Sequence, residues 1–252
     1  MNNKPIALIT GASRKIGIGS AAALELSRNG WDIAITYWTN YDSSMPWGSN
    51  TDDIRLLEDE IKKNGSNFYA IEADLSNAET PKIIFDSIEE KLGNISALIL
   101  SHCYSVDSCI LTTTINNFDL HFNINTRASW LLIKEFAARF KYEEMPGRII
   151  ALTSDHTAFN LPYGASKGAL DRIVLAAAEE LRDKRILANV INPGANDTGW
   201  MDNDFEHIVK EKTFQNRVGT PKDTSNLISF LCSQSGEWIN GQLICSDGGV
   251  RW

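Results

Sequence analysis

Short apolar runs of the buried-strand type alternate with longer helical segments along the whole chain. The expected strands are residues 5–10, 32–37, 68–73, 97–101, 148–153, 187–192 and 243–245. The expected helices are residues 20–29, 52–64, 81–92, 117–142, 162–183 and 222–233. Strands separated by helices of this length need crossover connections, which are right-handed in a parallel sheet. The alternation predicts a single α/β domain over residues 1–252, with a doubly wound parallel sheet of about seven strands and helices on both faces.

Composition excludes several classes of function. A net charge of −8 argues against sequence-independent nucleic-acid binding and against docking to an anionic membrane. No stretch approaches the length of a membrane span, and the first apolar run, Ile6–Ile9, is too short for a signal peptide. The four cysteines show neither Cys-x-x-Cys pairing nor zinc spacing, so free thiols and no metal site are expected. We expect a cytoplasmic protein with no nucleic-acid or membrane partner.

A glycine-rich turn, Thr-Gly-Ala-Ser-Arg-Lys-Ile-Gly-Ile-Gly at residues 10–19, joins the first strand to the first helix. Gly11 can form the tight turn, while Gly17 and Gly19 can let the backbone approach a pyrophosphate at the helix N-terminus. Glycines in a turn often mean only a turn, but this position favours dinucleotide binding. The expected cofactor-binding residues here are Gly11, Ser13, Arg14, Gly17, Ile18 and Gly19.

The second strand indicates which dinucleotide is bound. An acidic residue at its end would bind the ribose hydroxyls of NAD, but this chain has Trp38 there and no acid before Asp42. Arg14 and Lys15 lie where they could meet a 2′-phosphate, unless both are merely solvated. NADP(H) is therefore favoured over NAD(H). After the third strand, the pair Asp74-Leu75 is placed to contact the adenine.

Tyr163 and Lys167 are spaced four residues apart on a predicted helix, with Pro162 suited to its first turn. Residues at this spacing lie one above the other on the same helix face. A nearby cation favours the phenolate and lowers the pKa of a tyrosine, which would make Tyr163 a proton donor or acceptor. The alternative is an ordinary pair on a helix surface.

These motifs occur together with Asn192-Pro193-Gly194, Thr198 and a closing segment at residues 241–249. In this combination the chain resembles the short-chain dehydrogenase/reductase family over essentially its whole length, and in particular its bacterial 3-oxoacyl-acyl-carrier-protein-reductase-like members. The resemblance implies a Rossmann-like fold and NAD(P)-dependent chemistry on a small-molecule carbonyl or alcohol. The further cofactor-binding residues expected on these grounds are Trp38, Asp74, Leu75, Ser101, His102, Tyr163, Lys167, Pro193, Gly194 and Thr198.

The resemblance also assigns roles in a proton relay. Tyr163 would protonate the carbonyl oxygen during reduction, and Lys167 would lower the pKa of Tyr163 and hold the nicotinamide ribose. Ser154 would hydrogen-bond the substrate oxygen, and Asn125 would position a water that continues the relay. The hydride belongs to the nicotinamide. The loop of residues 195–214, with Trp200, Phe205 and Phe214, would cover the substrate as a lid.

Three segments depart from the family pattern. The glycine turn is two residues longer, with Lys15-Ile16 or their neighbours as the extra pair. The fourth strand ends in Leu-Ser-His-Cys at residues 100–103, where the family usually has Asn-Asn-Ala-Gly. Only eight residues separate Ser154 from Tyr163, which predicts a shortened substrate-side loop. In addition, residues 37–51 form an aromatic-rich insertion, which either wraps the adenosine or tucks against the sheet edge.

Two functions remain open on the sequence. The first is an NADP(H)-dependent carbonyl reductase or alcohol dehydrogenase. The second is a cofactor-binding protein with little or no turnover, acting as a redox sensor or partner. A serine hydrolase using Ser154, Asp155 and His156 is rejected, because adjacent residues cannot readily form a catalytic triad. Small residues on the 117–142 and 162–183 helices, together with the resemblance, predict a homotetramer or homodimer.

Overall fold

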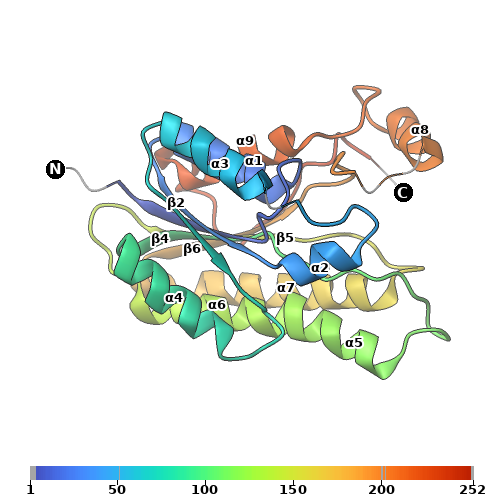
Figure 1. The fold of residues 1–252 in the computed structure, drawn as a ribbon, viewed down its shortest axis with the longest axis horizontal. Helices are drawn as coiled ribbons and strands as arrows, with labels where there is room; N and C mark the ends of the chain where they lie inside the picture. The colour runs from blue at the N-terminus through green and yellow to red at the C-terminus, as the bar shows by residue number, and fades with distance from the viewer. Residues whose placement is uncertain (1–3, 51, 200, 202, 251–252) are drawn as a thin grey trace.

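The computed structural model describes residues 4–50, 52–199, 201 and 203–250. They form a parallel sheet of seven strands in the order β3-β2-β1-β4-β5-β6-β7 (Figure 1). The strands are β1 (Ile6–Thr10), β2 (Asp32–Tyr37), β3 (Phe68–Glu72), β4 (Ile95–Leu100), β5 (Gly147–Leu152), β6 (Ile186–Asn192) and β7 (Leu243–Cys245). The order reverses between β1 and β4, which is where an open α/β sheet leaves a crevice for ligands. The predicted fold class is confirmed.

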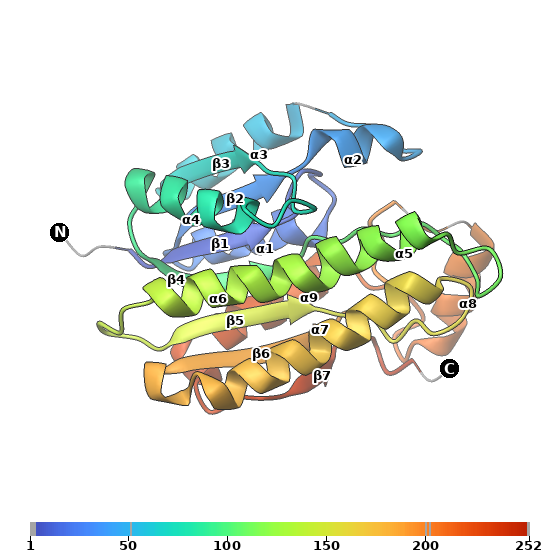
Figure 2. The ribbon, with the colours of Figure 1, turned by 90° about the horizontal axis from the view of Figure 1, so that it is seen from below.

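Helices cover both faces of the sheet, as Figures 1 and 2 show. One face carries α1 (Ile18–Arg28), α3 (Asp52–Lys63) and α9 (Pro221–Cys232). The other carries α4 (Thr80–Lys91), α5 (Ile115–His121), α6 (Ser129–Arg139) and α7 (Leu161–Glu180). Each layer closes its own hydrophobic core, because strands covered on both sides bury apolar residues on both. In β1, for example, Leu8 packs into one core and Ile9 into the other.

Two short helices were not predicted from the sequence. They are α2 (Thr39–Ser44), within the aromatic insertion, and α8 (Asn203–Lys212), within the expected lid. The predicted 117–142 helix is also not uniform, because a π-helical segment, Phe122–Ala128, lies between α5 and α6. Single-turn 3-10 segments follow α7 at Arg182–Lys184 and α9 at Gln234–Gly236. Of these differences from the predicted elements, α2, α8 and the π-helical segment belong to segments that border the site described below.

Candidate active site

A cavity of about 1440 Å³ opens along the carboxyl edge of the sheet. This exceeds the roughly 300–1,000 Å³ of a site for one drug-sized ligand, so it has room for a cofactor and a second molecule. The predicted site residues that line it are Gly11, Ser13, Arg14, Gly17, Ile18, Gly19, Trp38, Asp74, Leu75, Ser101, His102, Ser154, Tyr163, Lys167, Pro193, Gly194 and Thr198. Asn125 is the predicted residue that does not line it. The topology thus brings sequence-distant motifs to one crevice.

The glycine turn fits a dinucleotide pyrophosphate. Gly11 has a φ of 72°, and a Cβ built there would lie 2.5 Å from the Cα of His102, so no larger residue is accommodated. The N-terminus of α1, at Gly17 and Ile18, lines the cavity with neither a side-chain cap nor an acidic residue in its first turn. Its backbone N–H groups are therefore suited to holding an anion.

The two cations of the turn have different surroundings. Lys15 pairs with Glu60 of α3 at 3.0 Å and does not line the cavity. The guanidinium of Arg14 does line it, lies 4.5 Å from the ring centroid of Trp47, and donates a hydrogen bond to the carbonyl oxygen of Thr198 at 2.7 Å. Arg14 consequently spans the cavity from the glycine turn to the loop after β6.

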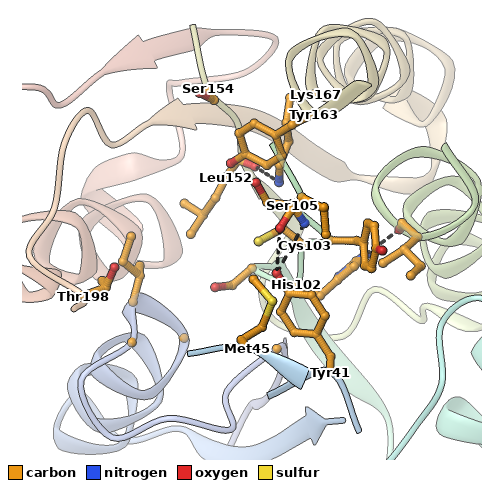
Figure 3. A pocket seen from close by; sticks show the side chains of 18 of the residues that line it. Tyr41, Met45, His102, Cys103, Ser105, Leu152, Ser154, Tyr163, Lys167 and Thr198 are labelled. Atoms are coloured by element: carbon orange, nitrogen blue, oxygen red, sulfur yellow. Dashed lines mark hydrogen bonds between the residues drawn. The ribbon is translucent and has the colours of Figure 1, made fainter. Parts of the chain in front are cut away.

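At the other end of the cavity, Ser154 lies close enough to Tyr163 to act on the pKa of its phenol. Figure 3 shows Ser154, Tyr163 and Lys167 along this part of the wall. The ammonium of Lys167 is buried, donates to the carbonyl oxygen of Leu152 at 2.8 Å and lies 5.8 Å from the centroid of the Tyr163 ring. The short connection between Ser154 and Tyr163 therefore does not keep the two side chains apart.

The pKa of Tyr163 is raised, opposite to the direction predicted from Lys167 alone. Burial of the phenol is the main cause, the nearby Cys103 thiol adds to it, and the hydrogen bond from Ser154 opposes it. Burial also lowers the pKa of Lys167, against the opposing influence of Cys103 and Asp171. Tyr163 thus holds its proton at neutral pH, which is the form that a general acid requires.

Asn125 lies behind the cavity wall. It is fully buried within the π-helical segment, where its Oδ1 accepts a hydrogen bond from the backbone N–H of Tyr104 at 2.7 Å. Its amide group donates to the carbonyl oxygen of Tyr104 and to Ser166 Oγ, both at 2.9 Å. These bonds fasten the segment after β4 to α7, and they occupy the side chain that was predicted to position a water.

His102 lines the cavity, and its ring nitrogens are held by the elements behind the cavity wall. Its Nε2 lies 3.0 Å from the carbonyl oxygen of Ile124, which can only accept, so Nε2 carries the proton and Nδ1 accepts from the Thr10 hydroxyl at 2.6 Å. Burial lowers the pKa of His102 to about 3, and nearby Lys167 acts in the same direction. A neutral histidine therefore lies within the segment where the family usually has Asn-Asn-Ala-Gly.

The aromatic insertion lines the cavity rather than the outer edge of the sheet. The hydroxyl of Tyr41 donates to the carbonyl oxygen of Ser105 at 3.4 Å and accepts from its N–H at 3.3 Å. The rings of Tyr41 and Tyr104 lie 5.6 Å apart between centroids, and Tyr41 also contacts Trp47 edge-on at 6.5 Å. The segment thereby reaches across from β2 to the loop after β4. Which part of the cofactor it covers stays a prediction.

Cavity residues that the sequence reasoning missed include Cys103, Tyr104, Ser105, Asp107 and Asn160. Four of them follow β4 directly, so their place after a strand that ends at the crevice was the available signal. Asn160 precedes α7 at the position where an asparagine usually caps a helix, and this hid its place in the cavity wall.

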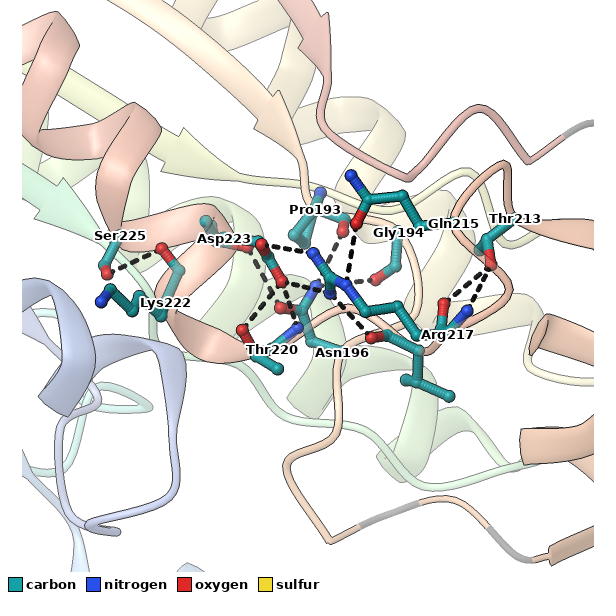
Figure 4. A network of polar contacts seen from close by, with 12 residues as sticks. Pro193, Gly194, Asn196, Thr213, Gln215, Arg217, Thr220, Lys222, Asp223 and Ser225 are labelled. Atoms are coloured by element: carbon teal, nitrogen blue, oxygen red, sulfur yellow. Dashed lines mark hydrogen bonds and ion pairs between the residues drawn. The ribbon is translucent and has the colours of Figure 1, made fainter.

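The expected lid contributes Met201 and Phe205 to the cavity. Phe214 is 92% exposed and does not line the cavity, so this aromatic residue of the expected lid faces away from it. Trp200 lies outside the described residues. The end of the segment is fixed by Arg217, which binds both carboxylate oxygens of Asp223 at 2.8 and 2.9 Å (Figure 4).

At the beginning of the same segment, Asn196 donates to the carbonyl oxygen of Pro193 at 2.7 Å and accepts from Thr224 of α9 at 3.3 Å (Figure 4). Both ends of the cover are therefore attached to the framework of the sheet and α9, while α8 lies between them. Among the described residues, no helix is long and apolar enough to span a membrane, and no cluster of side chains suits a metal ion.

A comparison with known protein families shows to which family this chain belongs. Residues 11–251 match the family model described as enoyl-(acyl carrier protein) reductase. The chain belongs to the short-chain dehydrogenase/reductase family. It is accordingly an oxidoreductase of a family that acts with NAD(P) on small molecules.

Similar proteins extend over nearly the whole of this dehydrogenase/reductase. An uncharacterized oxidoreductase of Bacillus subtilis, YjdA, is 36% identical over 98% of this chain and 97% of its own length. A chloroplastic NADPH-dependent aldehyde reductase-like protein of Arabidopsis thaliana is 34% identical over 97% of this chain and 93% of its own. The landomycin C-6 ketoreductase LanV, solved with bound NADP and rabelomycin, has a TM-score of 0.82 and 26% identity. That likeness covers 97% of this chain and 95% of LanV.

Proposed function

We propose that this protein is an NADP(H)-dependent reductase of small carbonyl compounds, able to oxidise the corresponding alcohols in reverse. The observation that carries the proposal is the grouping of Ser154 and Tyr163 with a buried Lys167 at the end of a cavity that begins in a dinucleotide-type glycine turn. When bound, the nicotinamide would supply the hydride. Bound NADP in LanV and the NADPH dependence named for the Arabidopsis relative support the choice of cofactor.

The side chains of the site would bind the substrate oxygen and transfer a proton to it. Ser154 donates a hydrogen bond to the substrate oxygen and holds it near the Tyr163 hydroxyl, which gives up its proton as negative charge develops on that oxygen. A tyrosine with a raised pKa is a reluctant acid, so the positive charge of Lys167 is needed to stabilise the phenolate that results. Asn125 supports the relay by holding the Tyr104 backbone and Ser166 in place.

The cofactor is held along the opposite half of the cavity. The N–H groups at the start of α1 would bind the pyrophosphate, and Arg14 would exchange the Thr198 carbonyl oxygen for a phosphate oxygen. Asp74 and Leu75, which line the cavity, would hold the adenine end, and Pro193 and Gly194 would hold the nicotinamide end. Trp38, Ser101 and His102 complete the wall between them.

The reductase and the turnover-free alternative are separated by one experiment. The purified protein is incubated with NADPH deuterated at the transferable position of the nicotinamide, and with a panel of aldehydes and ketones. We expect alcohol products that carry deuterium on the former carbonyl carbon. Tight NADPH binding in calorimetry, with no deuterated product from any compound, would instead support the redox sensor or partner.

A further inference from the structure

Asn160 is an unusual member of the cavity wall, because its side chain does not cap the helix that it precedes. It is 5% exposed at the start of α7, and its side chain makes no hydrogen bond to that helix. Asparagine is favoured at this position because its oxygen can accept from the first N–H groups of the helix. Here the side chain turns instead toward the segment after β4.

Two contacts fix the orientation of the Asn160 amide. Its Nδ2 donates to Ser105 Oγ at 3.0 Å and to a carboxylate oxygen of Asp107 at 2.6 Å. The opposite orientation would set the amide oxygen against a carboxylate oxygen, two acceptors without a proton between them. Asp107 therefore fixes Nδ2 on its own side and turns Oδ1 away from it, within the same amide plane.

That oxygen is buried and has no hydrogen-bond partner among the residues that the structure describes. Buried polar groups nearly always have partners, so an isolated acceptor on a residue that lines a ligand cavity points to a donor on the ligand. Asn160 and Asp107 line the same cavity as Tyr163 and Ser154. Ser105 lines it as well, and Figure 3 shows Ser105 together with Tyr163 and Ser154. A hydrogen-bond donor for Asn160 Oδ1 would therefore come from the substrate that reacts beside Tyr163.

The neighbouring wall is aromatic. Tyr41 and Tyr104 line the cavity with their ring centroids 5.6 Å apart, and Tyr104 rests edge-on against His121 at 4.8 Å. The Tyr41 hydroxyl is bonded to the backbone of Ser105, whose side chain receives the Asn160 amide. Tyr41 thereby connects the aromatic wall directly to the residue that supports Asn160.

We propose that Asn160 is a specificity-determining residue that accepts a hydrogen bond from a substrate hydroxyl. This inference rests on the proposed carbonyl reduction and names its substrate class, hydroxylated aryl carbonyl compounds. Ser105 and Asp107 hold the amide, Asn160 Oδ1 receives the hydroxyl proton, and the two tyrosines border the aromatic body. A compound without the hydroxyl leaves the acceptor unsatisfied, and this penalises its binding more than the lost contact alone would.

The test compares acetophenone with its meta- and para-hydroxy derivatives, and with the corresponding methoxy compounds, in NADPH-dependent reduction. The methoxy groups alter the electronics of the ketone similarly but cannot donate a hydrogen bond. We expect kcat/KM for at least one hydroxy compound to exceed that of acetophenone and of its methoxy counterpart about tenfold. In Asn160→Leu this preference should fall to near unity.

Val106→Ala is the matched control, because Val106 also lines the cavity but its side chain carries no acceptor. This variant should keep the preference. A wild-type preference near unity, or one that survives in Asn160→Leu, overturns the inference while leaving carbonyl reduction intact.

A binding measurement separates this inference from the proposed function. Calorimetry with the NADP⁺-loaded wild-type protein compares the affinities for the same compounds. The hydroxy compound should bind about tenfold more tightly than its methoxy counterpart even if no ketone is turned over. Equal affinities, or no binding of either compound, would overturn the subsite whether or not the variant folds.

Discussion

Arg14 and Lys15 are neighbouring cations whose different partners separate their expected roles. Arg14 lines the cavity and donates a hydrogen bond to the Thr198 carbonyl oxygen across it, whereas Lys15 is paired with Glu60 on the surface. A guanidinium can bind a phosphate with two hydrogen bonds. Adjacent positions in one motif therefore allow a direct comparison of a cofactor contact with a surface pair.

We predict that Arg14→Ala weakens NADPH binding by roughly 10- to 100-fold, the usual effect of losing a hydrogen bond to a charged group. Lys15→Ala should change it by less than about threefold, because exposed ion pairs contribute little. Fluorescence titration with NADPH measures both dissociation constants. Equal losses in the two variants would contradict the assignment of Arg14 as the phosphate contact.

His102 gives the fold a dependence on pH. Its pKa is about 3 in the folded protein and about 6.5 when unfolded, so between these values the unfolded chain binds more protons. The contribution of His102 to the free energy of unfolding is therefore greatest above pH 6.5 and decreases as the pH falls toward 3. At pH 5 the free energy of unfolding should be lower by about 2 kcal/mol because of this one group.

His102→Asn tests this, because asparagine retains a donor and an acceptor but does not titrate. Urea unfolding at pH 7.5 and pH 5 should show that the variant loses about 2 kcal/mol less than the wild type on acidification. The same loss in both proteins would show that His102 is not the group responsible.

The helix α7 and the short loop before it are matched to each other at Gly164. A Cβ at Gly164 would lie 2.0 Å from the carbonyl oxygen of His156, whereas a Cβ at Gly168 would meet nothing within 4 Å. The loop that carries Ser154 therefore rests directly on the helix that carries Tyr163. This close approach keeps Ser154 near Tyr163 despite the shortened connection.

Alanine substitutions at Gly164 and Gly168 should change the stability of the protein in opposite directions. Gly164→Ala must displace backbone, so we expect a loss of about 1–3 kcal/mol in stability and a lower kcat as Ser154 moves. Gly168→Ala should add about 0.5–1 kcal/mol, since alanine favours a helix, and should leave kcat unchanged. Thermal unfolding and steady-state kinetics measure both. An inactive but unshifted Gly168→Ala would contradict this account.

The elements that could be predicted from the sequence were those with a strong apolar pattern. β2 and β7 have the expected bounds, and the remaining strands differ by one or two residues at their ends. α2 is only six residues of largely polar sequence and α8 is mostly exposed, so neither shows a clear buried face. The π-helical segment has no distinctive composition, so the sequence did not indicate it. Its Asn125 contacts the segment after β4 and α7, which are distant in sequence.

At the scale of the whole molecule, the cavity was predictable as a set of motifs but not as a shape. The glycine turn and the Tyr163–Lys167 pair each follow from local chemistry, and the sheet order then brings them together. The raised pKa of Tyr163 and the open acceptor on Asn160 depend on burial by segments distant in sequence. Such effects have no local signature in the chain.

The outer surface of α5, α6 and α7 gives the molecule an apolar face that suits a second copy. Ile115 is 82% exposed and Trp130 47%, and Figure 2 shows α6 and α7 lying side by side on this face. Exposed apolar patches of this kind are typical of protein interfaces. We therefore propose, as the sequence predicted, a homodimer or homotetramer.

Light scattering after size-exclusion chromatography should give twice or four times the mass of one chain. Trp130→Glu should lower that mass at micromolar concentration, because it places a charge in the apolar interface. Ile83→Glu, equally exposed but on α4, should not. A wild-type monomer would rule out the assembly, and an effect of both variants would place the contact elsewhere.

The most direct test of the central claim is the kinetics of Tyr163→Phe with NADPH and the best ketone substrate. This variant lacks only the phenolic hydroxyl, which is the proposed proton donor. We predict that kcat/KM falls by about 10²–10⁴, the usual contribution of a general acid, while the dissociation constant for NADPH stays within about threefold of the wild type. Equal activity in the two proteins would contradict the account, because the proton would then reach the substrate oxygen from another group.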